Sequence, residues 1–158
     1  GCYDSIFRGC HGVAHLSHLA TYDDQDRIRR TCEHIIASVE ASGSVTRVVV
    51  TSSDTGFLRM MGTQAPDVMR GYVCEYRYLQ PTRRTAALGC RWLISHYSLV
   101  TPRLMERARK RGLRVSVWTV NDLNEAERLA SLGVDSIITD FPTSFMAHFS
   151  SRESRQRR

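Results

Sequence analysis

From residue 23 onward, apolar positions at helical spacing alternate with short apolar runs that are typical of buried strands. A first helix is predicted between Asp23 or Asp24, either of which can cap its start, and Gly43, which can end it. Its apolar positions recur every three or four residues: Ile28, Cys32, Ile35, Ile36 and Val39. Residues 47–53 follow as a β-branched run that is apolar on both faces, which predicts a buried parallel strand.

The same alternation continues to the end of the chain. Asp54 is expected to open a helix whose inward side chains are Phe57, Leu58 and Met61. Helix starts are also predicted at Thr101, with proline at the next position, and at Asp122, which has capping-box spacing to Glu125. Further strands are predicted at residues 68–76, 91–96, 113–120 and 135–139, with one more at 13–21 before the first helix.

Repeated strand–helix units predict a parallel sheet covered by helices. Such a sheet can be open and doubly wound, or it can form three-quarters of an eight-stranded barrel, and periodicity does not decide between them. A complete barrel typically needs about 250 residues, whereas the chain has 158. In both architectures the chemistry lies at the carboxyl ends of the strands.

Polar and aromatic residues gather at those strand ends. Trp118 and Asn121 could supply an apolar wall and an amide for a polar ligand, although Trp118 could equally be a packed core residue. His96 is a candidate acid or base, or a structural residue. The other residues at the strand ends are Ser52, Ser53, Asp54, Glu75, Tyr76, Tyr97, Thr119, Thr139 and Asp140.

The distribution of charge and the number of cysteines bear on the binding partners and the compartment expected for the protein. The net charge is +6, and half of this excess lies in residues 147–158, which we expect to be a disordered basic tail and not a contact to nucleic acid or to an anionic membrane. The rest of the excess is expected to be spread along the chain. Five cysteines without a CxxC pair indicate no zinc ribbon and a reducing, cytoplasmic compartment, with Cys32 and Cys74 in the core.

The sequence lacks the motifs of several other classes of protein. No apolar run reaches the roughly 18 residues of a membrane-spanning helix. His11, His15 and His18 have no carboxylate between them, so a zinc site of the HExxH type is absent. No glycine-rich nucleotide loop and no GxSxG serine motif occurs.

Residues 112–121 (GLRVSVWTVN) and 132–142 (LGVDSIITDFP) resemble the closing part of the glycerophosphodiester phosphodiesterase family. That family folds as a β/α barrel, and the resemblance covers residues 13–146. It implies a partial TIM-type barrel containing about strands 3 to 8, with residues 48–52 as the fourth strand. Residues 1–12 are left as a segment of uncertain relationship. The first two strands are then expected upstream of residue 1, and the two sheet edges left open would favour oligomers.

The resemblance also implies a chemistry. In the family, two histidines act as acid and base, and carboxylates hold Ca²⁺ or Mg²⁺ for the hydrolysis of glycerophosphodiesters. Here Phe7 takes the place of the first histidine, and the glutamate and lysine of the third strand are absent near residues 17–20. The resemblance therefore assigns no catalytic or metal-binding residue to this chain, which alone is expected to hold no metal and to be inactive.

What the resemblance does transfer is the wall of the substrate pocket. Trp118 corresponds to the family's pocket tryptophan, Asn121 to the asparagine that follows it, and Ser52 or Ser53 to the serine of the fourth strand. These residues would shape a site for a glycerophosphodiester substrate. Two alternatives stay open, namely a truncated, non-catalytic member of the family and an unrelated open α/β binding module.

Overall fold

A computed structural model of the chain describes residues 2–3, 5–7, 13–16, 25–43, 45–76 and 80–156, with side chains described between residues 25 and 150. Its centre is a run of parallel strands that pair in sequence order from β3 to β8. These strands are β3 (Val13–Leu16), β4 (Val49–Ser52), β5 (Met69–Cys74), β6 (Trp92–His96), β7 (Arg114–Trp118) and β8 (Ser136–Ile138). The strands predicted after the first helix are therefore confirmed, and the one predicted at 13–21 is confirmed over residues 13–16, because residues 17–21 lie outside the described residues.

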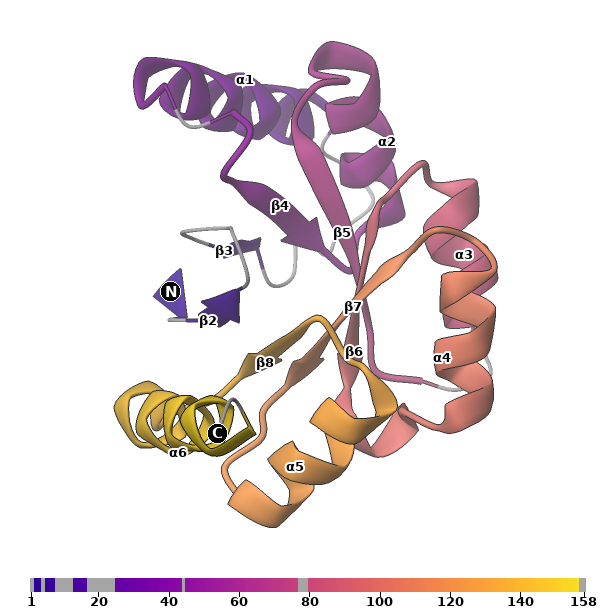
Figure 1. Cartoon of the computed structure of the whole chain (residues 1–158). Helices are drawn as coiled ribbons and strands as arrows, with labels where there is room; N and C mark the ends of the chain where they lie inside the picture. Colours follow the sequence, from indigo (N-terminus) through magenta and orange to yellow (C-terminus); the bar gives the residue numbers. More distant parts are fainter. Residues whose placement is uncertain are drawn as a thin grey trace.

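Six helices follow the strands and lie on the outer side of the sheet (Figure 1). They are α1 (Gln25–Ala41), α2 (Thr55–Gln64), α3 (Pro81–Ala87), α4 (Pro102–Arg109), α5 (Leu123–Leu132) and α6 (Pro142–Gln156). The sheet curves inside this row of helices, which is the arrangement of a partial β/α barrel. None of the helices in the described ranges is long and apolar enough to cross a bilayer.

The expectation of two open sheet edges is wrong, because both edges have an antiparallel neighbour. Strand β1 (Cys2–Tyr3) pairs with β3, and β2 (Ser5–Phe7) pairs with β8. One residue separates β1 from β2, so the start of the chain crosses the space between β3 and β8 (Figure 1). A short antiparallel segment can occupy the hydrogen-bonding groups of an edge strand without a crossover helix.

Helices α2, α4 and α5 start at the predicted capping residues, whereas the predicted caps of α1, Asp23 and Asp24, lie outside the described residues. Oδ1 of Asp54 accepts hydrogen bonds from the backbone N–H groups of Gly56 (2.7 Å) and Phe57 (3.0 Å). Oδ1 of Asp122 accepts from the N–H of Glu125 at 2.8 Å, but the Glu125 carboxylate binds Arg128. The capping box predicted there is thus only half formed.

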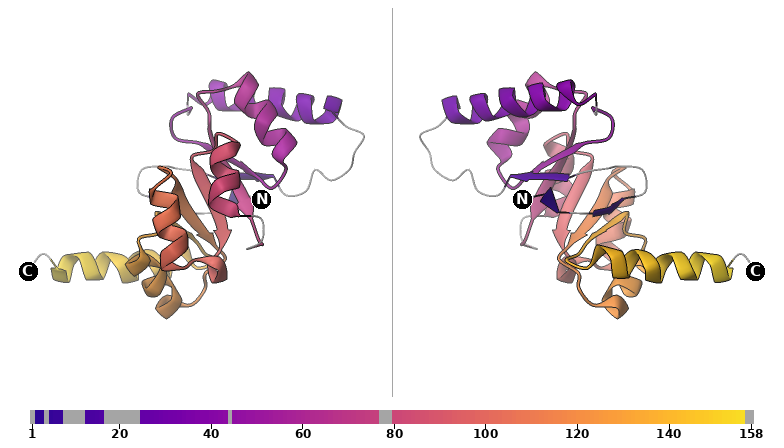
Figure 2. Two further views of the ribbon diagram at one scale, coloured as in Figure 1. Left: turned by 90° about the vertical axis from the view of Figure 1, so that its right-hand side faces the viewer. Right: turned by 90° about the vertical axis from the view of Figure 1, so that its left-hand side faces the viewer.

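Helix α3 was not predicted from the sequence. Its buried residues are Pro81, Thr82 and Thr85, so no stripe of long apolar side chains marks it. The Thr85 hydroxyl donates to the Pro81 carbonyl at 2.8 Å, which satisfies this polar group within the helix. Helix α6 extends away from the barrel (Figure 2) and continues to Gln156, through most of the segment 147–158 that the sequence analysis expects to be disordered.

Two hydrophobic clusters fill the space between the sheet and its helices. The α1–α2 cluster contains Cys32, Phe57, Leu58 and Met61, all with no exposed surface, as predicted. The α4–α6 cluster lies between the later strands and helices α4, α5 and α6 and includes Phe145. A third cluster, formed by Val49, Val73, Trp92, Ile94 and Ile138, fills the concave side of the sheet.

Candidate functional site

The carboxyl ends of β6 and β7 carry a group of three ring side chains. His96 and Trp118 are register partners, and their rings meet edge to face with centroids 5.4 Å apart. The ring of Tyr97 lies 4.5 Å from that of His96. All three side chains are half-buried, so they present a partly exposed aromatic surface at the rim of the barrel.

Trp118 has one face in the core and one polar atom without a partner. Its ring packs against the cluster on the concave side of the sheet, which agrees with the core interpretation. Its indole Nε1 is buried and has no hydrogen-bond partner among the described residues. Because a buried donor without an acceptor costs stability, this N–H is suited to a group that the structure does not contain.

His96 is held by the turn that follows it. Its Nδ1 lies 2.8 Å from the Ser98 hydroxyl and accepts from the Ser98 backbone N–H at 3.4 Å. An accepting Nδ1 places the proton of the neutral imidazole on Nε2. His96 thereby offers an N–H donor in the neighbourhood of Trp118.

Asn121 joins the ends of β7 and β8. Its Oδ1 accepts from the Thr139 hydroxyl (3.2 Å) and the Asp140 backbone N–H (3.0 Å), and its Nδ2 donates to Asp140 Oδ2 at 2.7 Å. The Thr139 hydroxyl oxygen also accepts from the Phe141 N–H. The predicted ligand-binding amide thus also links the ends of two strands, and we call this contact the latch. Its binding of a ligand stays a prediction.

The two serines of the fourth strand differ from each other. Ser52 is 2% exposed, and its Oγ accepts from the backbone N–H of Asp54 at 3.0 Å, which orders the turn into α2. Ser53 is exposed. Strand β4 is separated from β7 by β5 and β6, so the serines lie along the rim from Trp118 and not beside it.

Most of the described carboxylates at the rim bind other groups of the chain. Asp54 and Asp122 cap helices, and Asp140 is bonded to Asn121. Within the described residues no group of three or more histidine, cysteine or acidic side chains is arranged to hold an ion. His11 and His18 lie outside the described residues, and the side chain of His15 is not described. The described rim carboxylates are therefore not grouped as a divalent cation needs.

Sequence analysis missed a pair of buried hydroxyls. Ser116 and Ser136 are register partners on β7 and β8, with 0% and 3% exposure, and neither Oγ has a partner within the described part of the chain. Ser116 precedes Trp118 by two residues and so shares its face of the strand. A polar residue inside an apolar strand was the available signal.

The sequence model of the Glycerophosphoryl diester phosphodiesterase family matches residues 18–144, which is most of the chain. The chain belongs to this family. The match includes β4 to β8 and every described rim residue considered above.

Named relatives agree with this assignment. A glycerophosphodiester phosphodiesterase of Caldanaerobacter subterraneus is 28% identical over 110 residues, covering 70% of this chain and 45% of the relative. The Arabidopsis thaliana protein glycerophosphodiester phosphodiesterase GDPD4 is 30% identical over 115 residues, covering 72% of this chain and 35% of the relative. The chain thus spans less than half the length of these family members.

Solved structures show the same fold. A glycerophosphoryl diester phosphodiesterase from Silicibacter pomeroyi superposes with a TM-score of 0.77 at 28% identity, over 83% of this chain and 47% of that protein. An Oleispira antarctica phosphodiesterase in complex with the product sn-glycerol-3-phosphate gives a TM-score of 0.63 at 24% identity, over 75% and 50%. Strands β3 to β8 are therefore part of a family barrel.

Proposed function

We propose that this chain forms the substrate-binding wall of a glycerophosphodiester phosphodiesterase, which hydrolyses its substrate to an alcohol and a glycerol phosphate. The observation that carries the proposal is the contact between His96 and Trp118 at the carboxyl rim of a barrel from this family. Active sites of β/α barrels lie at that rim. The half-buried aromatic surface suits the carbon skeleton of a small polar ligand.

Each rim residue has its own task in this proposal. The Trp118 ring packs against the glycerol carbons, and its Nε1–H donates to a substrate oxygen, which removes the cost of the buried donor. Asn121 holds the ends of β7 and β8 in register and acts as a positioning residue. Ser52 orders the turn after β4, and the exposed hydroxyl of Ser53 is free to contact substrate.

The acid, the base and the metal ligands come from elsewhere in this proposal. Ca²⁺ or Mg²⁺ would stabilise negative charge on the phosphate, and it would be held by residues outside the described part of the chain. The described rim carboxylates are not grouped to hold that ion, and three of them, Asp54, Asp122 and Asp140, cap helices or bind Asn121. A cytoplasmic location and oligomer formation also stay predictions.

Hydrolysis of glycerophosphocholine by the full-length protein, with Ca²⁺ or Mg²⁺ present, tests the proposal. Trp118→Ala should raise KM about tenfold, while Trp118→Phe, which keeps the ring but loses the N–H, should have an intermediate effect. Met146→Ala is the matched control, because Met146 is a large apolar residue that is 56% exposed on α6 and is not one of the strand-end residues. Equal KM values for wild type, Trp118→Ala and Met146→Ala would remove Trp118 from the site.

One observation favours a second candidate, a family member that binds but does not hydrolyse. Three of the described rim carboxylates, Asp54, Asp122 and Asp140, are engaged in hydrogen bonds within the chain. Calorimetry with glycerol 3-phosphate, alongside the hydrolysis assay, separates the two candidates. Binding that depends on Trp118 without any turnover would favour the non-catalytic role.

A further inference from the structure

The outer surface of helices α3 and α4 has a much higher density of positive charge than the rest of the chain. Residues 80–114 contain nine of the 22 basic residues and one of the 16 acidic residues. The expectation that basic residues outside the tail are spread along the chain is therefore wrong. The remainder of the chain carries more acidic than basic residues.

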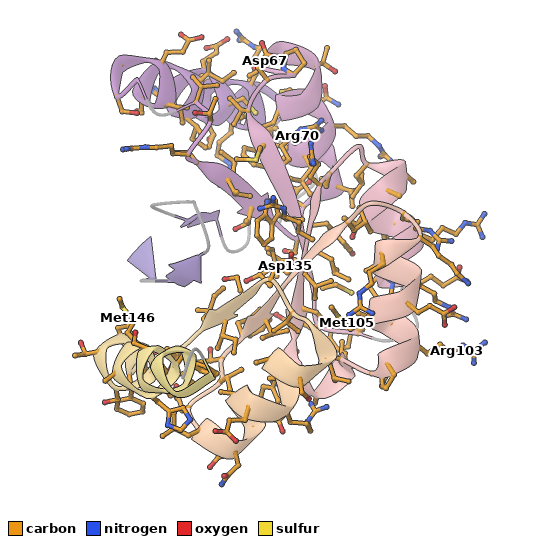
Figure 3. The ribbon with its side chains drawn as sticks, viewed as in Figure 1. Asp67, Arg70, Arg103, Met105, Asp135 and Met146 are labelled. Carbon is orange, nitrogen blue, oxygen red and sulfur yellow. The ribbon has the colours of Figure 1, made fainter. Side chains whose placement is uncertain are left out.

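The fold places this charge on one face. Arg103, Arg107 and Arg111 recur at intervals of four, so they lie above one another along α4 and the turn after it. Lys110 shares this side of the helix, while Met105 and Ala108 are buried on the other side. Helix α3 lies against α4 and adds Arg83, whereas the guanidinium of Arg84 lies over the ring of the buried Tyr72, 5.9 Å from its centroid. Figure 3 shows Arg103 pointing from α4 away from the sheet.

Five residues, Arg83, Arg103, Arg107, Lys110 and Arg111, form what we call the basic face, and all five are exposed. The single acidic residue in this region, Glu106, pairs with Lys110 at 2.7 Å. Stacked like charges at intervals of four destabilise a helix, so the three arginines oppose the formation of α4. A face that accumulates repulsion in this way is suited to a partner with many negative charges.

We propose that the basic face binds the surface of an anionic phospholipid membrane. Two helices side by side present a broad, outward-facing array of guanidinium groups, and guanidinium pairs well with phosphate. The exposed large apolar residues of the described chain, Tyr76, Phe141 and Met146, lie outside α3 and α4. Binding is therefore electrostatic adsorption without insertion of side chains into the bilayer. Single-stranded nucleic acid is the less suitable partner, because its binding sites combine basic grooves with aromatic side chains on which bases stack.

Co-sedimentation of the full chain with vesicles tests the proposal. We expect binding to phosphatidylcholine vesicles that contain phosphatidylserine, and none to vesicles of phosphatidylcholine alone. Binding should fall sharply between about 0.1 M and about 1 M salt, where the screening length drops from ~10 Å to ~3 Å. These two comparisons need no variant, so they do not depend on how a substituted chain folds.

A pair of matched triple variants locates the contact. R103Q/R107Q/R111Q should weaken vesicle binding about a hundredfold, as three lost surface charges imply. R30Q/R47Q/R59Q removes the same charge from exposed positions on other parts of the chain and should leave binding within about threefold of wild type. Circular dichroism should give both variants the melting temperature of wild type within a few degrees.

Three results would overturn the proposal. The first is equal binding to vesicles with and without phosphatidylserine. The second is an equal loss of vesicle binding in the two triple variants, which would mean that only net charge matters. The third is binding of a DNA or RNA oligonucleotide through the basic face when vesicles are not bound. Hydrolysis of a water-soluble glycerophosphodiester does not use this face, so failure here leaves the proposed function untouched.

Discussion

The carboxyl ends of β7 and β8 differ from that of β4 in what their polar side chains bind. Asn121 and Asp140 bind to each other across two strands. Ser52 and Asp54 bind instead to the backbone of the turn and helix that follow their own strand. Polar residues after a buried strand therefore have two roles in this fold. The Asn121–Asp140 contact joins two neighbouring strands, whereas the bonds of Ser52 and Asp54 named here order the turn and helix that follow one strand.

The two regions also rest on different hydrophobic clusters. Phe57 on α2 belongs to the α1–α2 cluster, and Phe145 on α6 belongs to the α4–α6 cluster, with exposures of 0% and 1%. Hydrogen-bonded strands run without interruption from one cluster to the other. The two clusters are thus joined through one sheet and through Leu104, which packs against both.

The largest expected effect comes from truncating either phenylalanine. Phe57→Ala and Phe145→Ala should each lower the free energy of unfolding by about 3–5 kcal/mol, because each leaves a cavity in a buried cluster. Both variants should still unfold in one cooperative transition, because the sheet couples the two clusters. Urea denaturation followed by far-ultraviolet circular dichroism measures this. Two resolved transitions, of which only one shifts in each variant, would show that the regions unfold independently.

A smaller effect is expected from breaking the latch between β7 and β8. Asn121→Ala removes three hydrogen bonds and leaves Asp140 and Thr139 without these partners, which should cost about 1–3 kcal/mol. Asn124→Ala, at an exposed position on α5, is the matched control and should stay within about 0.5 kcal/mol of wild type. Equal stability of the two variants in urea would mean that Asn121 does not hold the strands together.

The contact between Asn121 and Asp140 could not be predicted from the sequence, whereas the helix caps could. Helix starts at Asp54, Thr101 and Asp122 were predictable, because a capping residue acts within three positions of itself. The Asn121–Asp140 contact joins residues 19 apart, and strand register alone brings them together. A carboxamide at a strand end is typical of both a ligand-binding group and a latch. The sequence therefore predicted the place of Asn121 but not its bonds.

The same limit applies to the start of the chain and to the concave side of the sheet. Strands β1 and β2 are two and three residues long, too short for any apolar period to show. The burial of Ser116 and Ser136 depends on the curvature of the sheet, which follows from how all the strands pack. A serine within an apolar strand marks these positions in the sequence, but residue spacing does not show that the two hydroxyls are buried or that β1 and β2 form.

A third prediction concerns alkaline pH and separates the two hydrophobic clusters by their cysteines. Burial raises the pKa of Cys32 and of Cys90 from 9.0 to about 11, and both lie in the α1–α2 cluster. Unfolded thiols lose their protons near pH 9.0 while the folded chain keeps them. The protonated, buried thiols therefore contribute their full stabilisation of the fold below about pH 9, and this contribution is lost as pH rises toward about 11.

Urea midpoints at about pH 8 and about pH 10.5 test this assignment. The urea midpoint of wild type should be lower at about pH 10.5 than at about pH 8. The double variant Cys32→Ala/Cys90→Ala should show a smaller decrease, even if it is less stable at neutral pH. Cysteine is absent from the α4–α6 cluster as described, so Phe145→Ala should keep the slope of wild type. An unchanged slope in the cysteine variant would assign the alkaline loss to other groups.

The smallest expected effect distinguishes two neighbouring serines. Ser52→Ala removes the acceptor of the Asp54 N–H and should lower the free energy of unfolding by about 1 kcal/mol. Ser53→Ala changes an exposed side chain and should shift it by less than about 0.5 kcal/mol. The effects on substrate binding are expected in the opposite order. Because only the exposed Ser53 hydroxyl can reach a ligand, Ser53→Ala should raise KM for glycerophosphocholine more than Ser52→Ala does. If Ser52→Ala changed KM but not stability, the end of β4 would belong with the ends of β7 and β8 as a ligand surface, and the contrast between the two regions would disappear.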